Sequence, residues 1–221
     1  GTLLHRPMEN FDRVLPDLDV ALHDFDGYLP FTVHGPLKPR RVKVNSEAGS
    51  QFLSGLLFAY SSGATQPVTI EVAGLKSRPY IDLTLKVLEH FGKPVAHNAY
   101  KEFHFDPASF SPPANVEITI EGDWSSAAYY LVAGAIAGDI TVANMHLDSL
   151  QADKAILDVL QSAGADIVIG EKNISVKRSA LQAFEFDATH CPDLFPVLAI
   201  LGACSNGESA VRGIHRLFHK E

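Results

Sequence analysis

A unit that recurs along the chain constrains its fold most: an amphipathic helix, then a glycine, then a short β-branched strand. The four predicted helices span 78–91, 124–137, 149–163 and 191–205. The strands that follow them begin at Pro94, Ile140, Ile167 and Ser209. Glycine readily adopts the left-handed conformation that ends many helices. We therefore expect left-handed glycines at the ends of these helices: Gly92, Gly138, Gly164 and Gly207.

Other segments complete an α/β pattern. A short helix is predicted at Pro7 to Leu15, and further strands at 42–44, 68–72, 116–120 and 174–177. The order of strand, helix, strand, helix and paired strands suggests copies of one supersecondary unit. A loop rich in proline and serine, 107–115, precedes a predicted domain boundary near residue 121. The expected domains are therefore residues 1–120 and 121–221.

Composition and charge exclude several classes of protein. Hydrophobic residues make up 46% of the 221 residues, enough for a real core. A net charge of −8 argues against a nucleic-acid or anionic-membrane surface, because those need spread basic patches. The longest apolar stretches, 127–137 and 195–204, are too short to span a bilayer. We expect a cytoplasmic protein with a free, buried thiol at Cys204.

Two helix starts combine the residue types that bind anions. Ser50 and Gln51 open one apolar helix, and Ser77 to Tyr80 open another beside Lys76. The first N–H groups of a helix lack intrahelical partners and lie at its positive dipole end, so they attract phosphate. Each serine could instead be a simple N-cap. One such start decides little, whereas the cations Lys76 and Arg78 beside the second favour a phosphorylated ligand.

Two later segments hold further candidates. Asp193 lies in the first turn of a predicted helix, where a carboxylate is stabilised by the helix dipole. Its spacing alone favours capping, although it could also serve as a base for a substrate hydroxyl. His215 and His219 have the i,i+4 spacing of helical metal ligands, but no third ligand accompanies them. We therefore predict no metal and no cofactor.

Taken together, these segments resemble the EPSP synthase family, the 3-phosphoshikimate 1-carboxyvinyltransferases. The resemblance spans the whole chain, and the order and spacing of its motifs make it specific. The motifs are Arg6-Pro-Met, Ser50-Gln-Phe-Leu, Lys76-Ser-Arg-Pro-Tyr-Ile-Asp, Glu121-Gly-Asp-Trp-Ser-Ser-Ala-Ala-Tyr, Pro192-Asp and the closing Arg216 to Glu221.

The resemblance implies an α/β fold of repeated βαβαββ units, an inside-out α/β barrel, incomplete here at both ends. Family members are about twice as long, so the chain would hold the later part of one domain and the earlier part of the other. We expect a monomeric parent protein with no nucleic-acid or membrane partner, and a fragment that is inactive alone.

The resemblance also implies substrates and site residues. The family transfers the enolpyruvyl group of phosphoenolpyruvate to the 5-hydroxyl of shikimate 3-phosphate and releases phosphate. Asp193 would handle the hydroxyl proton, Glu221 would lie near the enolpyruvyl methylene, and Arg6 and Gln51 would approach phosphoenolpyruvate. The implied contacts to shikimate 3-phosphate are Ser50, Gln51, Ser77, Tyr80, Asp193, Arg216 and Lys220.

Three positions depart from the family pattern, and two alternatives stay open. Gly49 stands where the family usually has a phosphate-binding serine, Arg216 where some members have asparagine, and Pro196 where a family helix continues. One alternative is the related UDP-N-acetylglucosamine enolpyruvyl transferases, which use a reactive loop cysteine. The other is a non-catalytic binding or structural module that keeps the fold.

Overall fold

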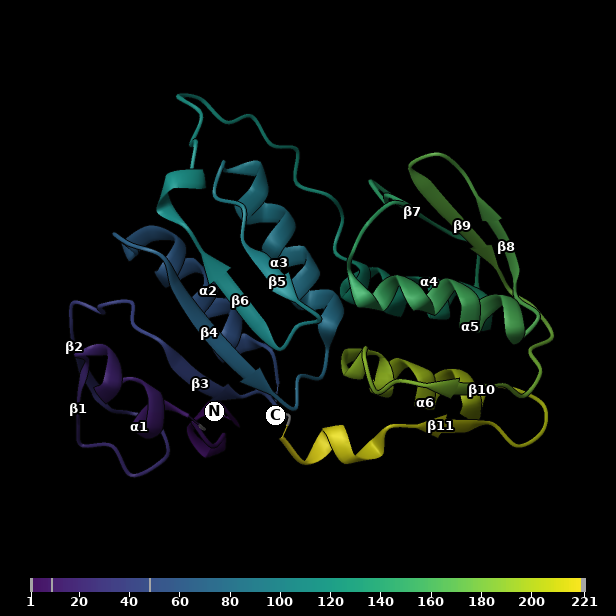
Figure 1. The fold of residues 1–221 in the computed structure, drawn as a ribbon. Helices are drawn as coiled ribbons and strands as arrows, with labels where there is room; N and C mark the ends of the chain where they lie inside the picture. The colour runs from purple at the N-terminus through teal and green to yellow at the C-terminus, as the bar shows by residue number, and fades with distance from the viewer. Residues whose placement is uncertain (1, 9, 48, 220–221) are drawn as a thin grey trace. The chain divides into compact units, whose positions relative to one another are not determined.

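The computed structural model describes residues 2–8, 10–47 and 49–219, which form two compact units (Figure 1). The first unit extends to Glu117 and includes the last segment from Leu217. The second is Ile118–Arg216. Each has its own hydrophobic core. The assignment of residues 1–120 and 121–221 to parts of two enolpyruvyl transferase domains stays a prediction.

The centre of the first unit is one βαβαββ unit. Its elements are β3 (Val42–Asn45), α2 (Gln51–Gly63), β4 (Val68–Ala73), α3 (Arg78–His90), β5 (Ala96–Asn98) and β6 (Glu102–Phe105). The sheet has the order β3-β4-β6-β5. β3 and β4 are parallel, whereas β6 is antiparallel to both β4 and β5. A short 3-10 helix, η3 (Pro107–Ser109), follows the sheet.

One face of this sheet packs against the helices. Alternate residues of β3, β4 and β6 are buried, as the period of two in a half-buried strand requires. Val44, Ile70 and Phe103 are fully buried in the core that also holds Leu57 and Tyr60 of α2. The Tyr60 hydroxyl donates to the carbonyl of Arg40 at 2.7 Å, so this buried phenol is hydrogen-bonded. Burial raises the pKa of Tyr60 to about 12.

Short elements precede the sheet. They are η1 (Thr2–His5), α1 (Phe11–Val14), η2 (Pro16–Leu18) and the antiparallel pair β1 (Ala21–His23) and β2 (Thr32–His34). The helix predicted at Pro7 to Leu15 is therefore too long. Asn10, with φ 70°, is left-handed, and a regular helix cannot run through that conformation.

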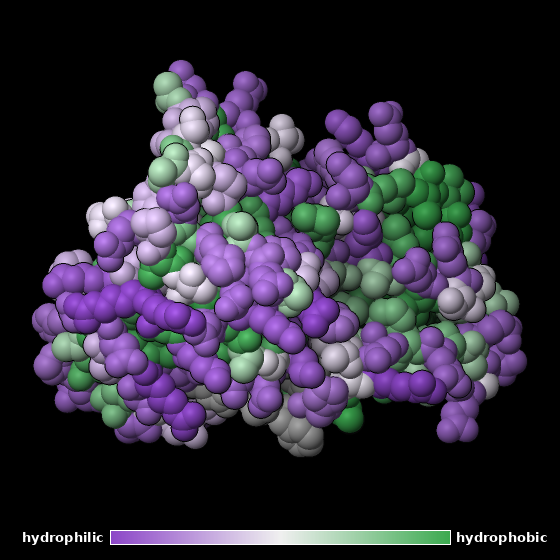
Figure 2. Space-filling view, viewed as in Figure 1, coloured by the Kyte–Doolittle hydropathy of each residue, from purple (hydrophilic) through white to green (hydrophobic). Residues whose placement is uncertain are grey.

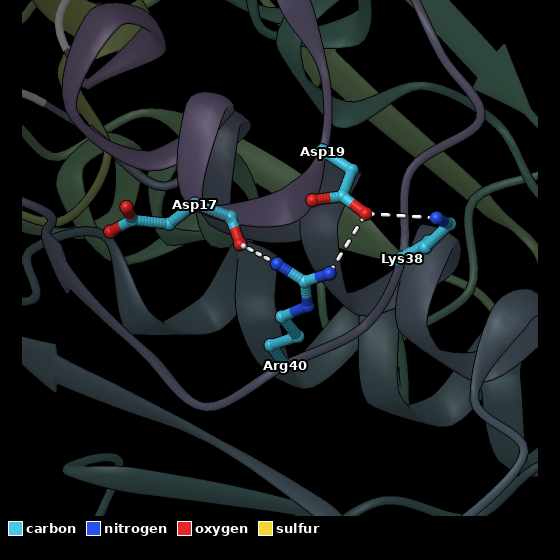
Figure 3. A network of polar contacts seen from close by, with 4 residues as sticks. All are labelled: Asp17, Asp19, Lys38 and Arg40. Carbon is cyan, nitrogen blue, oxygen red and sulfur yellow. Dashed lines mark hydrogen bonds and ion pairs between the residues drawn. The ribbon is translucent and has the colours of Figure 1, made fainter.

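A polar network joins η2 to the segment that enters β3 (Figure 3). Asp19 accepts from Lys38 at 2.9 Å and from Arg40 at 2.8 Å, and Arg40 also donates to the carbonyl of Asp17 at 3.4 Å. The Lys38 hydrogen bond, followed by the charge of Arg40, lowers the pKa of Asp19. Because these side chains are exposed, the network orients the chain more than it stabilises it.

The second unit repeats the pattern without its first strand. It contains α4 (Trp124–Ala137), β7 (Ile140–Ala143), η4 (Ala152–Ala155), α5 (Ile156–Ser162), β8 (Asp166–Ile169) and β9 (Asn173–Lys177). The antiparallel sheet has the order β7-β9-β8. After it come β10 (Glu185–Asp187), η5 (Pro192–Leu194), α6 (Phe195–Ala203), β11 (Ala210–Arg212) and η6 (Ile214–His219), with β10 and β11 parallel. Figure 2 shows hydrophobic surface over β8, where Val168 and Ile169 are exposed.

Matching hydrogen bonds relate the two units. Ser46 N, just after β3, donates to Ala73 O at 2.9 Å, and Gly122 N donates to Asn144 O at 2.8 Å. The segment before Gly122 thus occupies the place of a first strand. However, the strand predicted at 116–120 is wrong, because these residues form no ladder within the described chain, and Ile120 is 74% exposed. An alternating pattern makes a strand only where a partner edge is available.

Three further sequence expectations need correction. Gly138 has φ −162°, which is extended backbone that any residue adopts, whereas the other three predicted glycines have positive φ. Cys204 is exposed, because α6 ends at Ala203 before the thiol can join its buried face. Pro196 lies in the first turn of α6 and so does not interrupt it, since the first N–H groups have no intrahelical acceptor.

We predict that Gly92→Ala destabilises the protein strongly. Gly92 has φ +69°, and a Cβ there would lie 2.1 Å from the carbonyl oxygen of Ser111. Left-handed strain and backbone overlap together should cost about 3 kcal/mol in urea unfolding followed by circular dichroism.

Two matched variants separate these causes. Gly164→Ala has similar strain at φ +76° but no atom within 4 Å of its Cβ, so it should lose only about 1 kcal/mol. Gly138→Ala, which has neither problem, should be neutral or slightly stabilising. Equal unfolding free energies for all three variants would contradict the packing described here.

Candidate functional site

The two predicted anion-binding helix starts lie at one edge of the first unit's sheet. β3 and β4 are parallel neighbours, so their carboxyl ends share an edge, and α2 and α3 begin in the segments that follow (Figure 1). The backbone hydrogen bond from Ser46 N to Ala73 O joins these two segments. Ser54 and Thr84 hydroxyls, 2.9 Å apart, join α2 to α3. Two positive helix ends therefore converge.

Arg6 and Gln51 meet at the start of α2. The Arg6 guanidinium donates to Gln51 Oε1 at 2.5 Å across 45 residues of sequence. Ser50 is the N-cap residue and is buried, but its hydroxyl makes no capping bond to the helix. The first turn of α2 contains no acidic residue. Capping therefore does not explain why a serine stands at position 50, and the Arg6 guanidinium lies beside this turn.

The start of α3 has the same character. Ser77 is buried and left-handed, with φ 53°, and its side chain does not cap the helix. The first turn lacks acidic residues, and Lys76 and Arg78 flank Ser77. Arg78 lies over the ring of Tyr100, 5.3 Å from its centroid. The residues thus form a cationic, hydroxyl-bearing helix start.

A cavity of about 470 Å³ opens beside α2. Arg6, Gly49 and Gln51 line its polar part, and side chains that include Phe11 and Phe52 line its apolar part. The two phenyl rings pack with centroids 5.0 Å apart. Its volume is within the range of small-molecule sites. The cavity therefore brings Gly49, the position that departs from the family pattern, next to Arg6 and Gln51.

The corresponding start of α4 in the second unit is occupied by protein side chains. Asp123 caps α4 by accepting from the N–H groups of Ser125 and Ser126. Gln151 accepts from Trp124 N at 2.8 Å. The Ser125 hydroxyl donates to Asp153, which is 1% exposed, at 2.5 Å. The Asp123 carboxylate and the Gln151 amide thus satisfy N–H groups at the start of α4 that an anion would otherwise bind.

Sequence analysis missed Asp153 as a structural residue of this region. It lies in η4, within a segment whose pattern predicts only an ordinary amphipathic helix. The available signal was an acidic residue with apolar residues one helix turn before it and one helix turn after it. Without the fold, nothing indicated that Ser125, 28 residues earlier, would be its donor.

Asp193 is half-buried in η5, next to Cys191. Burial raises the pKa of the Cys191 thiol to about 12, with additional contributions from the nearby charges of Asp153, Asp187 and Asp193. The charges of three carboxylates therefore act on this thiol, and all three residues belong to the second unit.

The remaining predicted site residues are less fully described. Arg216 lies in η6, and only its backbone placement is described. Lys220 and Glu221 lie outside the described residues. Within the described ranges, no cluster of three or more His, Cys, Asp or Glu side chains is arranged to hold a metal ion. No helix in those ranges is long and apolar enough to cross a membrane.

The fold is that of the enolpyruvyl transferases. An EPSP synthase from Acinetobacter baumannii superposes with a TM-score of 0.73 at 22% identity, covering 100% of this chain and 52% of that one. The enolpyruvyl transferase NikO from Streptomyces tendae superposes with a TM-score of 0.63 at 18% identity, covering 89% and 50%. The predicted α/β fold of βαβαββ units is therefore confirmed.

The sequence identifies the family within this fold. The family model of EPSP synthase (3-phosphoshikimate 1-carboxyvinyltransferase) matches residues 2–221. The 3-phosphoshikimate 1-carboxyvinyltransferase of Clostridium novyi is 33% identical over 100% of the chain and 50% of its own length. That of Thermococcus kodakarensis is 36% identical over 95% and 50%. The chain belongs to the EPSP synthase family, and it spans about half the length of these curated relatives.

We predict that the two thiols differ in reactivity. Because the pKa of Cys191 is about 12, only about 10⁻⁴ of it is thiolate at pH 8, and its side chain is buried. Iodoacetamide should therefore label exposed Cys204 and spare Cys191 until urea unfolds the protein, as peptide mass spectrometry would show. A Cys204→Ser variant should take up no label when folded. Rapid native labelling of Cys191 would contradict its described burial.

Proposed function

We propose that the chain forms part of an enzyme that transfers the enolpyruvyl group of phosphoenolpyruvate to the 5-hydroxyl of shikimate 3-phosphate. The Ser50 and Ser77 helix starts would bind the phosphate of shikimate 3-phosphate. Family membership supports the reaction. The arrangement of the two helix starts supports this assignment of the phosphate.

One contrast carries the proposal. In the second unit, the start of α4 is closed by Asp123 and Gln151, and Asp153 of η4 accepts from the Ser125 hydroxyl. In the first unit, the first turns of α2 and α3 contain no acidic residue, and Arg6, Lys76 and Arg78 accompany them. The same backbone unit thus holds carboxylates in one copy and cations in the other. A phosphate would complete the cationic copy.

The proposed roles follow this arrangement. Ser50, Gln51, Ser77 and Tyr80 would contact shikimate 3-phosphate from the first unit. Arg6, which is bonded to Gln51, would approach phosphoenolpyruvate together with Gln51. Further contacts would come from Arg216, Lys220 and Asp193. Gly49 has no side-chain donor, so its backbone N–H would bind phosphate where the family usually uses a serine.

The proposed chemistry needs a proton acceptor and a proton donor. The substrate 5-hydroxyl attacks C2 of phosphoenolpyruvate as its proton passes to Asp193, and C3 receives a proton. Phosphate then leaves from the tetrahedral intermediate as C3 loses a proton and the double bond reforms, and Glu221 would lie near the methylene group.

Three further assignments belong to this proposal. Residues 1–120 and 121–221 would be parts of the two domains of the enzyme, a division that the two compact units support. A cytoplasmic location would suit the two free thiols, Cys191 and Cys204. A monomeric state stays a prediction.

We predict that the chain distinguishes shikimate 3-phosphate from shikimate through Ser77. Calorimetric titration should show at least about tenfold tighter binding of the phosphorylated compound. Hydrogen bonds to charged groups contribute about 1.5–3 kcal/mol, so Ser77→Ala should weaken shikimate 3-phosphate binding about tenfold or more. The same variant should bind shikimate as the wild type does, because shikimate lacks the phosphate.

The control for this titration is Ser162→Ala. Its hydroxyl donates to Asp158 O within α5, far along the chain from either helix start, so binding should not change. If Ser77→Ala and the wild type bind shikimate 3-phosphate equally, the assignment of Ser77 is wrong. If the wild type prefers neither compound, the proposed substrate is wrong.

A further inference from the structure

A strained turn lies at the same sheet edge as the two helix starts. β5 and β6 are joined through Asn98 to Lys101, whose i to i+3 hydrogen bond is 2.8 Å long. Its central residues, Ala99 and Tyr100, have φ of 47° and 58°. Turns of this kind are normally built from Asn and Gly, because side chains disfavour positive φ. Neither central residue here relieves that strain.

The strain is maintained by contacts that Tyr100 makes to α3. Its hydroxyl donates to Asp82 Oδ1 at 2.7 Å. Its ring packs against His97, with centroids 4.4 Å apart, and Arg78 lies over it. Lys101 O accepts from Val72 N of β4 at 2.7 Å, which anchors the turn to the sheet. Tyr100 therefore contacts two residues, Arg78 and Asp82, that flank Tyr80 on α3.

These contacts fix the first turn of α3 from the outside. Arg78 is the first residue of the helix and Asp82 is four residues later, on the same helix face. Ser77 directly precedes the segment from Arg78 to Asp82 that Tyr100 contacts, and Tyr80 lies within that segment. Strained backbone of this type is a reason to look for function. The hydrogen bond that the Tyr100 hydroxyl donates to Asp82 also raises the pKa of Tyr100, so the phenol keeps its proton.

We propose that Tyr100 is a positioning residue that holds the start of α3 in the geometry that binds the phosphate of shikimate 3-phosphate. The inference rests on the proposed function. Tyr100 itself would not contact the substrate. It would act through Asp82 and Arg78, by restricting the Ser77 to Tyr80 turn. The Asp82 carboxylate, held by this phenol, would also be kept from competing with the substrate for the cations.

The test compares Tyr100→Phe with Tyr130→Phe in two measurements. Tyr100→Phe keeps the ring under Arg78 and removes only the bond to Asp82. Tyr130 is 61% exposed on α4 and serves as the matched control. Tyr100→Phe should raise the dissociation constant of shikimate 3-phosphate about fivefold or more and leave that of shikimate unchanged. It should also speed hydrogen exchange of the Tyr80 amide, which donates to Ser77 O, about tenfold. Tyr130→Phe should change neither.

Variants at Asp82 provide the rescue. Asp82→Asn keeps Oδ1 as an acceptor for the phenol and should bind shikimate 3-phosphate within about twofold of wild type, whereas Asp82→Ala should match Tyr100→Phe. Combining Asp82→Ala with Tyr100→Phe should cause no further loss, because both remove one interaction.

The outcomes separate this inference from the proposed function. If the wild type binds shikimate 3-phosphate and Ser77→Ala weakens binding, but Tyr100→Phe does not, the positioning role is wrong and the proposed function stands. If the wild type shows no preference for the phosphorylated compound, the proposed function fails and this inference fails with it. Additive losses in the double variant would also overturn the inference.

Discussion

The parallel pairing of β3 with β4 is the constraint on which the candidate site depends. Two parallel strands need a crossover, and α2 supplies it. Their register pairs Asn45 with Ala73, so both chains leave the sheet at one level. The segments that follow must therefore begin their helices side by side. Because of this register, Ser50 and Ser77 lie at the same edge of the sheet, although they are 27 residues apart in sequence.

The two units show how one backbone unit can serve opposite purposes. In the second, Asp123 and Gln151 satisfy the N–H groups that begin α4, and the buried carboxylate of Asp153 is bonded to Ser125. Such caps stabilise helices by about 1 kcal/mol each. In the first unit, α2 and α3 begin without side-chain caps from their own N-cap residues. Stability available from capping is thus not taken up at the edge where we place the substrate.

Sequence predicted the elements better than the contacts. The helix at 124–137 was predicted with its observed bounds, because a long apolar period and a polar start act locally. The prediction of a strand at 116–120 was wrong because a strand forms only where another strand is available to pair with it. The prediction of a left-handed Gly138 was wrong because its helix ends in extended backbone. At the site, the helix starts could be found from Ser, Gly and cation patterns. Tyr100 could not, since its role depends on a turn strained by tertiary contacts.

Because the net charge of the protein is −8, phosphate binding depends on the balance of charges close to the sheet edge. At physiological ionic strength the Debye length is about 8 Å, so distant carboxylates are screened and only groups near the sheet edge act on a phosphate. Arg6, Lys76 and Arg78 supply positive charge there, and Asp82 is the carboxylate nearest them along α3. By accepting a hydrogen bond from Tyr100, Asp82 is held in a fixed position on the helix. Glu47 is a second carboxylate at this edge, since a Cβ on Gly74 would lie 3.0 Å from its Oε1. The cations of the edge can then act on a phosphate in an acidic protein, in part because the strained turn holds Asp82 in place.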